Sequence, residues 1–104
     1  MKTLAEVTAA LQAANQVSFT PASRTGGCGR AYVVISAPKD VVKLVSKACQ
    51  ELGLMFLKSA YGTSGNAIYI GYDNADGRAL AKSDAFAKVL SERGISCYAD
   101  AVAD

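Results

Sequence analysis

Residues 31–53, AYVVISAPKDVVKLVSKACQELG, place a compact β-branched run directly before an amphipathic segment. The run over 31–36 is rich in valine and isoleucine, which is typical of a central strand. Pro38 suits the first turn of a helix, because the N–H that proline lacks would be unpaired there. Gly53 is typical of a helix C-terminus. The apolar residues between them recur at helical spacing and predict one buried face: Val41, Leu44, Val45, Ala48 and Leu52.

The remaining core repeats this unit with two additional strands. The predicted elements are a strand over 54–61, a hairpin loop over 62–66, a strand over 67–72, a turn with capping residues over 73–77, a helix over 78–93 and a strand over 95–99. The order strand, helix, strand, strand, helix, strand predicts an α+β fold, the ferredoxin-like βαββαβ sandwich. Two helices then cover one face of a four-stranded antiparallel sheet.

An N-terminal extension precedes this core. Thr3 and Glu6 match the capping box and predict a helix over 4–15. Its apolar stripe is narrow and rich in alanine, so the helix is marginal alone and must lie against something. A polar, glycine-rich stretch then leads into the first strand. We therefore expect one compact domain, with a helix and glycine-rich connection over 1–30 and the ferredoxin-like core over 31–104.

Composition limits the class of protein. The 104 residues are 51% apolar and 19% charged, which fits a single globular domain. The net charge of +2 is too small to indicate a protein that wraps duplex nucleic acid or binds membrane surfaces. The chain has no apolar run of membrane-spanning length and no signal-peptide core. We expect a soluble cytoplasmic protein.

Catalytic and metal-binding signatures are missing from the sequence. The chain contains no histidine, which excludes histidine-based catalysis and mixed Cys/His metal sites. Its three cysteines are Cys28, Cys49 and Cys97, which are too few and too far apart for a disulfide framework or a four-thiolate zinc site. Cys28, between two arginines, is the best candidate for a reactive thiol. We expect neither enzymatic activity, nor a cofactor, nor a metal.

The alternation of side chains along the strands predicts an aromatic sheet face. If Val33 and Ile68 face the helices, then Tyr32, Tyr69 and Tyr98 share the opposite face. If the hairpin loop pairs Tyr61 with Ala67, that face also receives residues 55, 57 and 59. An aromatic face left in water generally marks an interface.

Three occupants of that face remain open. The N-terminal helix could fold back over it, with Leu4, Val7 and Leu11 against the tyrosines. A second copy of the chain could pack face to face with the first. A ligand or a nucleic acid could instead stack on the rings.

The last alternative rests on a resemblance. In the order of elements, and in the positions of Tyr32 and Tyr69 on the two central strands, the chain resembles RNA-recognition motif domains, in which bases stack on aromatic side chains. Ser64 and Asn66 stand where that family has its basic start of the third strand. The resemblance implies binding of single-stranded nucleic acid on the sheet.

Basic residues provide two further candidate binding sites. Arg24 and Arg30 flank the glycine-rich stretch, which is either a linker or a phosphate-binding loop. Lys39, Lys43 and Lys47 form a helical stripe, which is either a solvated face or a contact for a phosphate backbone.

These observations predict a small non-enzymatic intracellular binding protein that uses its open sheet face, with single-stranded nucleic acid as one candidate partner. The alternative is a protein–protein interaction module. Such a module would be a homodimer or a small regulator or inhibitor of a larger complex, of the type that phages and mobile elements encode.

Overall fold

The structure is a computed structural model that describes residues 2–19, 28–58, 65–74 and 77–103. Within these residues three helices and four strands follow one another in the order α1 (Leu4–Asn15), β1 (Cys28–Ile35), α2 (Lys39–Leu52), β2 (Phe56–Leu57), β3 (Ala67–Asn74), α3 (Arg78–Glu92) and β4 (Cys97–Ala103). The chain is a single compact α+β domain. No helix among the described residues is long and apolar enough to cross a bilayer.

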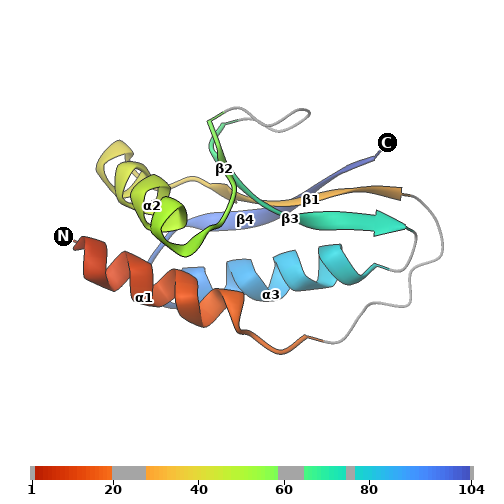
Figure 1. Cartoon of the computed structure of the whole chain (residues 1–104), viewed down its shortest axis with the longest axis horizontal. Coiled ribbons are helices and arrows are strands. Elements are labelled where there is room, and N and C mark those ends of the chain that lie inside the picture. The colour runs from red at the N-terminus through yellow and green to blue at the C-terminus, as the bar shows by residue number, and fades with distance from the viewer. Residues whose placement is uncertain (1, 20–27, 59–64, 75–76, 104) are drawn as a thin grey trace.

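The four strands form one antiparallel sheet in the order β2-β3-β1-β4. Strands β1 and β3 are the longest and pair along most of their length (Figure 1). Strand β4 lies beside β1 at one edge, and the two-residue β2 lies beside β3 at the other. Because β2 is so short, the C-terminal half of β3 has no neighbour on its outer side among the described strands.

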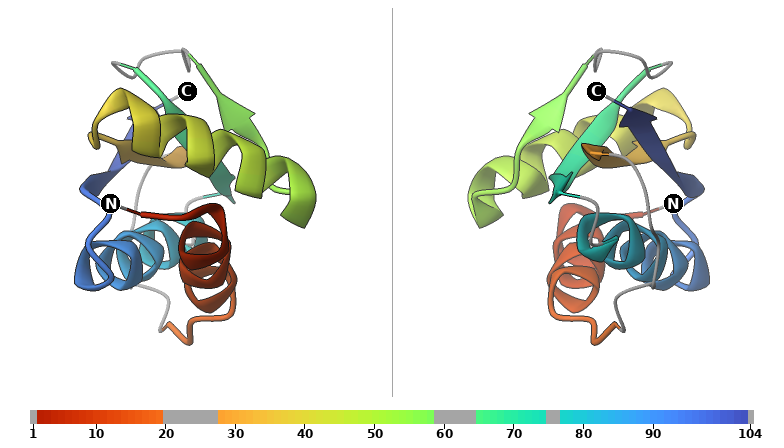
Figure 2. Two further views of the ribbon diagram at one scale, coloured as in Figure 1. Left: turned by 90° about the vertical axis from the view of Figure 1, so that its left-hand side faces the viewer. Right: turned by 90° about the vertical axis from the view of Figure 1, so that its right-hand side faces the viewer.

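Helices α1 and α3 lie on the same side of the sheet. Helix α3 packs against β1, β3 and β4, α1 lies beside α3, and α2 crosses one end of the sheet near β2 (Figures 1 and 2). The sequence predicts two helices on this face with the N-terminal helix apart from them. Instead α1 occupies the space between α2 and α3. The described residues thus form three helices and one four-stranded antiparallel sheet.

The position of α1 excludes one of the three alternatives for the occupant of the sheet face. Val7 and Leu11 are fully buried in the main core, together with Val33 of β1 and Phe86 of α3. They therefore do not cover the tyrosines, which lie on the other face. The narrow apolar stripe of α1 explains this placement, because Ala10 and Ala14 are small enough to let the helix approach its neighbours closely. The helical layer, rather than the sheet, stabilises this otherwise marginal helix.

Local sequence signals account for most helix ends. The predicted capping box is present, with the Glu6 N–H donating to Thr3 Oγ1 at 3.2 Å and the Thr3 N–H donating to Glu6 Oε1 at 3.1 Å. Gly53 ends α2 in the left-handed conformation, at φ +74°. At the start of α3 the N-cap residue is Gly77, in the left-handed conformation at φ +71°, and it has no side chain with which to cap the helix.

The second strand is shorter than predicted and has another register. Its described part is Phe56–Leu57 rather than 54–61, and Leu57 pairs with Ala67 in the position that the sequence assigned to Tyr61. The prediction that Tyr61 pairs with Ala67 is therefore wrong, because the hairpin connection is longer than five residues. Since the shift is an even number of residues, Leu57 keeps its predicted face. Ser59 and Tyr61 themselves lie outside the described residues.

Candidate functional site

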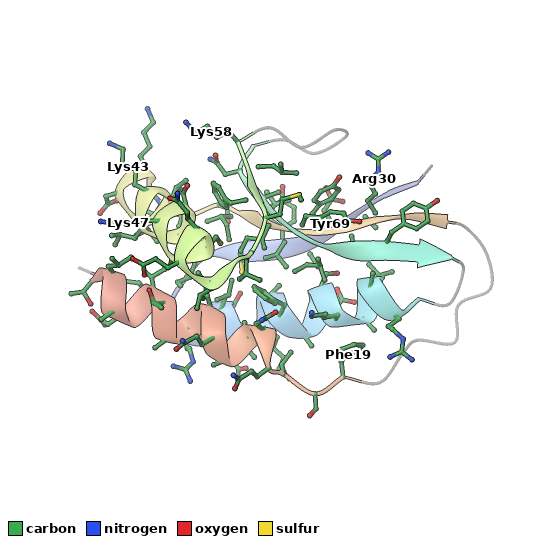
Figure 3. All side chains as sticks on the ribbon, in the orientation of Figure 1. Phe19, Arg30, Lys43, Lys47, Lys58 and Tyr69 are labelled. Carbon is green, nitrogen blue, oxygen red and sulfur yellow. The ribbon has the colours of Figure 1, made fainter. Side chains whose placement is uncertain are left out.

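The side of the sheet away from α1 and α3 carries a group of tyrosines. Cross-strand pairs place Tyr32 opposite Tyr69 and Val34 opposite Tyr98. Val33 and Ile68 lie between these residues and point into the main core, so the tyrosines point the other way. Figure 3 shows the Tyr69 side chain on that side, together with Arg30. We call this surface the tyrosine face; its residues are Arg30, Tyr32, Val34, Leu57, Ala67, Tyr69, Tyr72, Tyr98 and Asp100.

Tyr72 joins this face through a β-bulge. The pairing of β1 with β3 shifts between Ala31 and Tyr32, so that Ile70 is left as an extra residue and Tyr72 pairs with Arg30. Strand β1 alternates regularly, and Arg30 therefore shares the face of Tyr32. Tyr72 consequently shares the face of Tyr69, although strict alternation along β3 would separate them.

Sequence reasoning missed Tyr72 because it assumed regular alternation through 67–72. A glycine inside a strand often marks a bulge or a close approach of another element, and Gly71 provides that signal here. A Cβ atom on Gly71 would lie 3.3 Å from the Cβ of Ala79 in α3. The glycine thus allows α3 to approach β3 directly beneath the bulge.

Part of the tyrosine face is buried. Tyr32 and Val34 are each only 2% exposed and Ala67 is fully buried, and these three form a second small hydrophobic cluster with Leu57 and Tyr69. Tyr32 therefore cannot present its ring to a ligand. The prediction that Tyr32 contributes an accessible ring is therefore wrong. The buried ring instead supports the neighbouring side chains of the small cluster.

The accessible aromatic area comes from other tyrosines. Tyr72 is 42% exposed, Tyr98 is 45% exposed, and Tyr69 is half-buried. The half-buried Arg30 stands beside Tyr72 in the cross-strand pair. The face therefore combines three reachable phenol rings with one guanidinium, and its acidic member is Asp100, opposite Tyr32 on β4.

The predicted basic residues do not form one site. Lys39, Lys43 and Lys47 are all exposed on α2, but only Lys43 and Lys47 line a groove between α2 and β2. Lys58, which follows β2, lines the same groove and was not singled out from the sequence. Arg24 lies outside the described residues. The structure thus brings two of the three predicted lysines together with a third from another element.

The described cysteines show no sign of reactivity. Burial raises the pKa of the Cys49 thiol to about 12. Burial also raises the pKa of Cys97, whose Sγ donates a hydrogen bond to the Ala87 carbonyl at 3.4 Å. Both are free thiols, and no group of potential metal ligands occurs within the described ranges. The side chain of Cys28 lies outside them.

Comparisons with known proteins add no relative: no protein family matches the sequence, and neither the curated proteins nor the solved structures yielded a match.

Proposed function

We propose that this protein is a small, non-enzymatic intracellular binding protein that holds single-stranded nucleic acid on its tyrosine face. The observation that carries the proposal is the β-bulge, which adds Tyr72 to the face of Tyr69 and places Arg30 beside it. Without the bulge, the accessible rings among the described residues of this face would be Tyr69 and Tyr98.

The chemistry of the face suits unpaired bases. Stacking of a base on an aromatic side chain contributes about 1–3 kcal/mol and tolerates any sequence, because every base has a π-face. Tyr69 and Tyr72 are three residues apart on β3, which corresponds to roughly 10 Å or slightly less at a bulge. Each ring can therefore take a different base. The Arg30 guanidinium can pair with a phosphate or stack on a base.

This arrangement of helices and strands also supports a ferredoxin-like fold. We regard the domain as a ferredoxin-like sandwich whose helical layer has been widened by α1. Because α1 completes the layer on one side, the opposite sheet face retains its exposed tyrosines. Aromatic side chains on two central strands are the feature in which the chain resembles RNA-recognition motif domains.

The experiment is an amide-resolved NMR titration of the full chain with short oligonucleotides, first single-stranded RNA and DNA and then a duplex. We expect shifts at Arg30, Tyr69, Tyr72 and Tyr98 with single strands. Tyr72→Ala and Tyr98→Ala should each weaken binding about fivefold or more, in line with the loss of one stacked base. Tyr72→Phe retains the ring and should bind nearly as well as the unaltered protein.

Other outcomes would overturn the proposal. If the shifts fall on α1 or α3, or if the duplex binds as tightly as the single strand, the tyrosine face is not the site. If no oligonucleotide binds and the mass in solution is twice 10.8 kDa, the face is a homodimer interface instead.

A further inference from the structure

A groove beside the tyrosine face gathers positive charge from two elements. Its volume is about 260 Å³, and it is lined by Lys43, Lys47 and Gln50 of α2 together with Phe56, Lys58 and Asn66. The two α2 lysines are one helical turn apart, so both lie on the side of the helix next to β2. Lys58 reaches the groove from the strand side. Three lysine residues thus line one concavity.

The described lining of the groove carries no compensating negative charge. None of the described residues that line it is a carboxylate, although Asp40 and Glu51 lie on the same helix. Within the described part of the chain, the structure gives Lys43, Lys47 and Lys58 no hydrogen-bond or ion-pair partner. Three like charges around one hollow repel one another unless an anion lies between them. The arrangement is therefore suited to an anion from outside the chain.

We propose that this groove binds phosphate, and that in the complex it holds the backbone of the strand whose bases stack on the tyrosine face. Lysine ammonium groups recognise phosphate as point charges, and the side-chain amides of Gln50 and Asn66 add hydrogen-bond donors. Lys43 and Lys58 lie on the same side of the molecule as Tyr69 and Arg30 (Figure 3). One strand can thus reach both sites. The choice of a nucleic-acid backbone as occupant rests on the proposed function, whereas phosphate binding by the groove does not.

Salt dependence of oligonucleotide binding provides the first test. The probe is a fluorescein-labelled single-stranded oligothymidylate of about ten nucleotides, followed by anisotropy between about 50 and 200 mM salt. We compare Lys43→Gln/Lys58→Gln with the control Lys82→Gln/Lys88→Gln, which removes the same charge from α3, outside the groove. In the groove variant, the magnitude of the negative slope of log affinity against log salt should be smaller by about 1.4, because two phosphate contacts are lost at about 0.7 each. In the control variant, this slope should change little.

Titration with inorganic pyrophosphate separates this proposal from the proposed function. We expect amide shifts at Lys47 and Asn66 in the unaltered protein and none in the groove variant. If pyrophosphate produces these shifts but no oligonucleotide binds, the groove is a phosphate site and the nucleic-acid function is refuted.

The converse results are equally decisive. Oligonucleotide binding that is equally tight, with equal salt slopes, in the groove and control variants would overturn the groove and leave the tyrosine face in place. Absence of pyrophosphate shifts together with equal slopes would exclude any phosphate site here. Binding of an acidic protein, but of no phosphate compound, would also refute it.

Discussion

Tyr32 and Tyr69 meet edge to face across the two central strands, with their ring centroids 5.7 Å apart and their planes inclined at 65°. The buried ring of Tyr32 holds the half-buried ring of Tyr69 at a fixed angle, since edge-to-face geometry is favoured by the aromatic quadrupoles. The two residues therefore have different roles. Tyr32 stabilises the sheet, whereas Tyr69 can offer one side of its ring to a partner.

Replacing Tyr32 should destabilise the domain strongly. Tyr32→Ala removes a ring that is only 2% exposed and should lower the free energy of unfolding by about 3 kcal/mol. Tyr98→Ala, which removes a ring that is 45% exposed, should change it by about 0.5 kcal/mol or less. Urea unfolding followed by circular dichroism measures both. Equal effects of the two substitutions would show that Tyr32 is not part of the core.

The bulge in β3 should depend on the contact between Gly71 and α3. Because a Cβ at position 71 would lie 3.3 Å from the Cβ of Ala79, Gly71→Ala should destabilise the domain by about 1 kcal/mol. Ala79→Gly removes the opposing atom but costs about 1 kcal/mol in helix propensity. In the double variant the penalty of Gly71→Ala should vanish. A double-mutant cycle by urea unfolding measures this coupling, and strictly additive effects would exclude the contact as the cause.

Loss of the capping box should weaken α1 and, through it, the core. Thr3→Ala should lower the free energy of unfolding by about 1 kcal/mol, because it leaves the Glu6 N–H without its acceptor. Thr3→Ser keeps the hydroxyl and should retain most of the stability. Thermal unfolding distinguishes the two variants. An unchanged unfolding temperature for Thr3→Ala would mean that α1 needs no cap once it is packed.

The same cap predicts a dependence on acid. Hydrogen bonds from the Thr3 backbone and side chain hold the pKa of Glu6 below its usual value of 4.5. A carboxyl whose pKa is lowered on folding stabilises the folded state above its unfolded pKa, and this contribution is lost as the pH falls through the folded pKa. Below about pH 4.5, therefore, Glu6→Gln should lose less stability with falling pH than the unaltered chain. Parallel curves for the two proteins would contradict the assignment.

The buried thiol of Cys49 predicts a dependence on alkali. Burial raises its pKa from 9.0 to about 12, so the folded state keeps a proton that the unfolded chain releases. Stability from this group is complete below pH 9 and decreases as the pH rises from 9 toward 12, by on the order of 1 kcal/mol per pH unit. Urea unfolding from about pH 8 to pH 11 should therefore show a shallower decline for Cys49→Ala. An identical decline would place the titrating group elsewhere.

Local sequence signals determined most helix ends and the faces of regular strands. The capping box defines the start of α1 at Leu4, and Gly53 ends α2, because each depends only on residues within one or two turns. The alternation that sends Val33 and Ile68 to one side is equally local, since successive side chains of a strand point to opposite faces. The central position of β1 and β3 followed from the order of the elements.

Only the tertiary structure decided which residues come together. The side on which α1 packs depends on the space that α2 and α3 leave open, and the burial of Tyr32 depends on neighbours from other strands. The register of β1 against β3 contains one extra residue, which moves Tyr72 to the face of Tyr69. Lys58 and Lys43 line the same groove because β2 lies next to α2. These relationships join residues that are distant in sequence, and no periodicity within one segment encodes them.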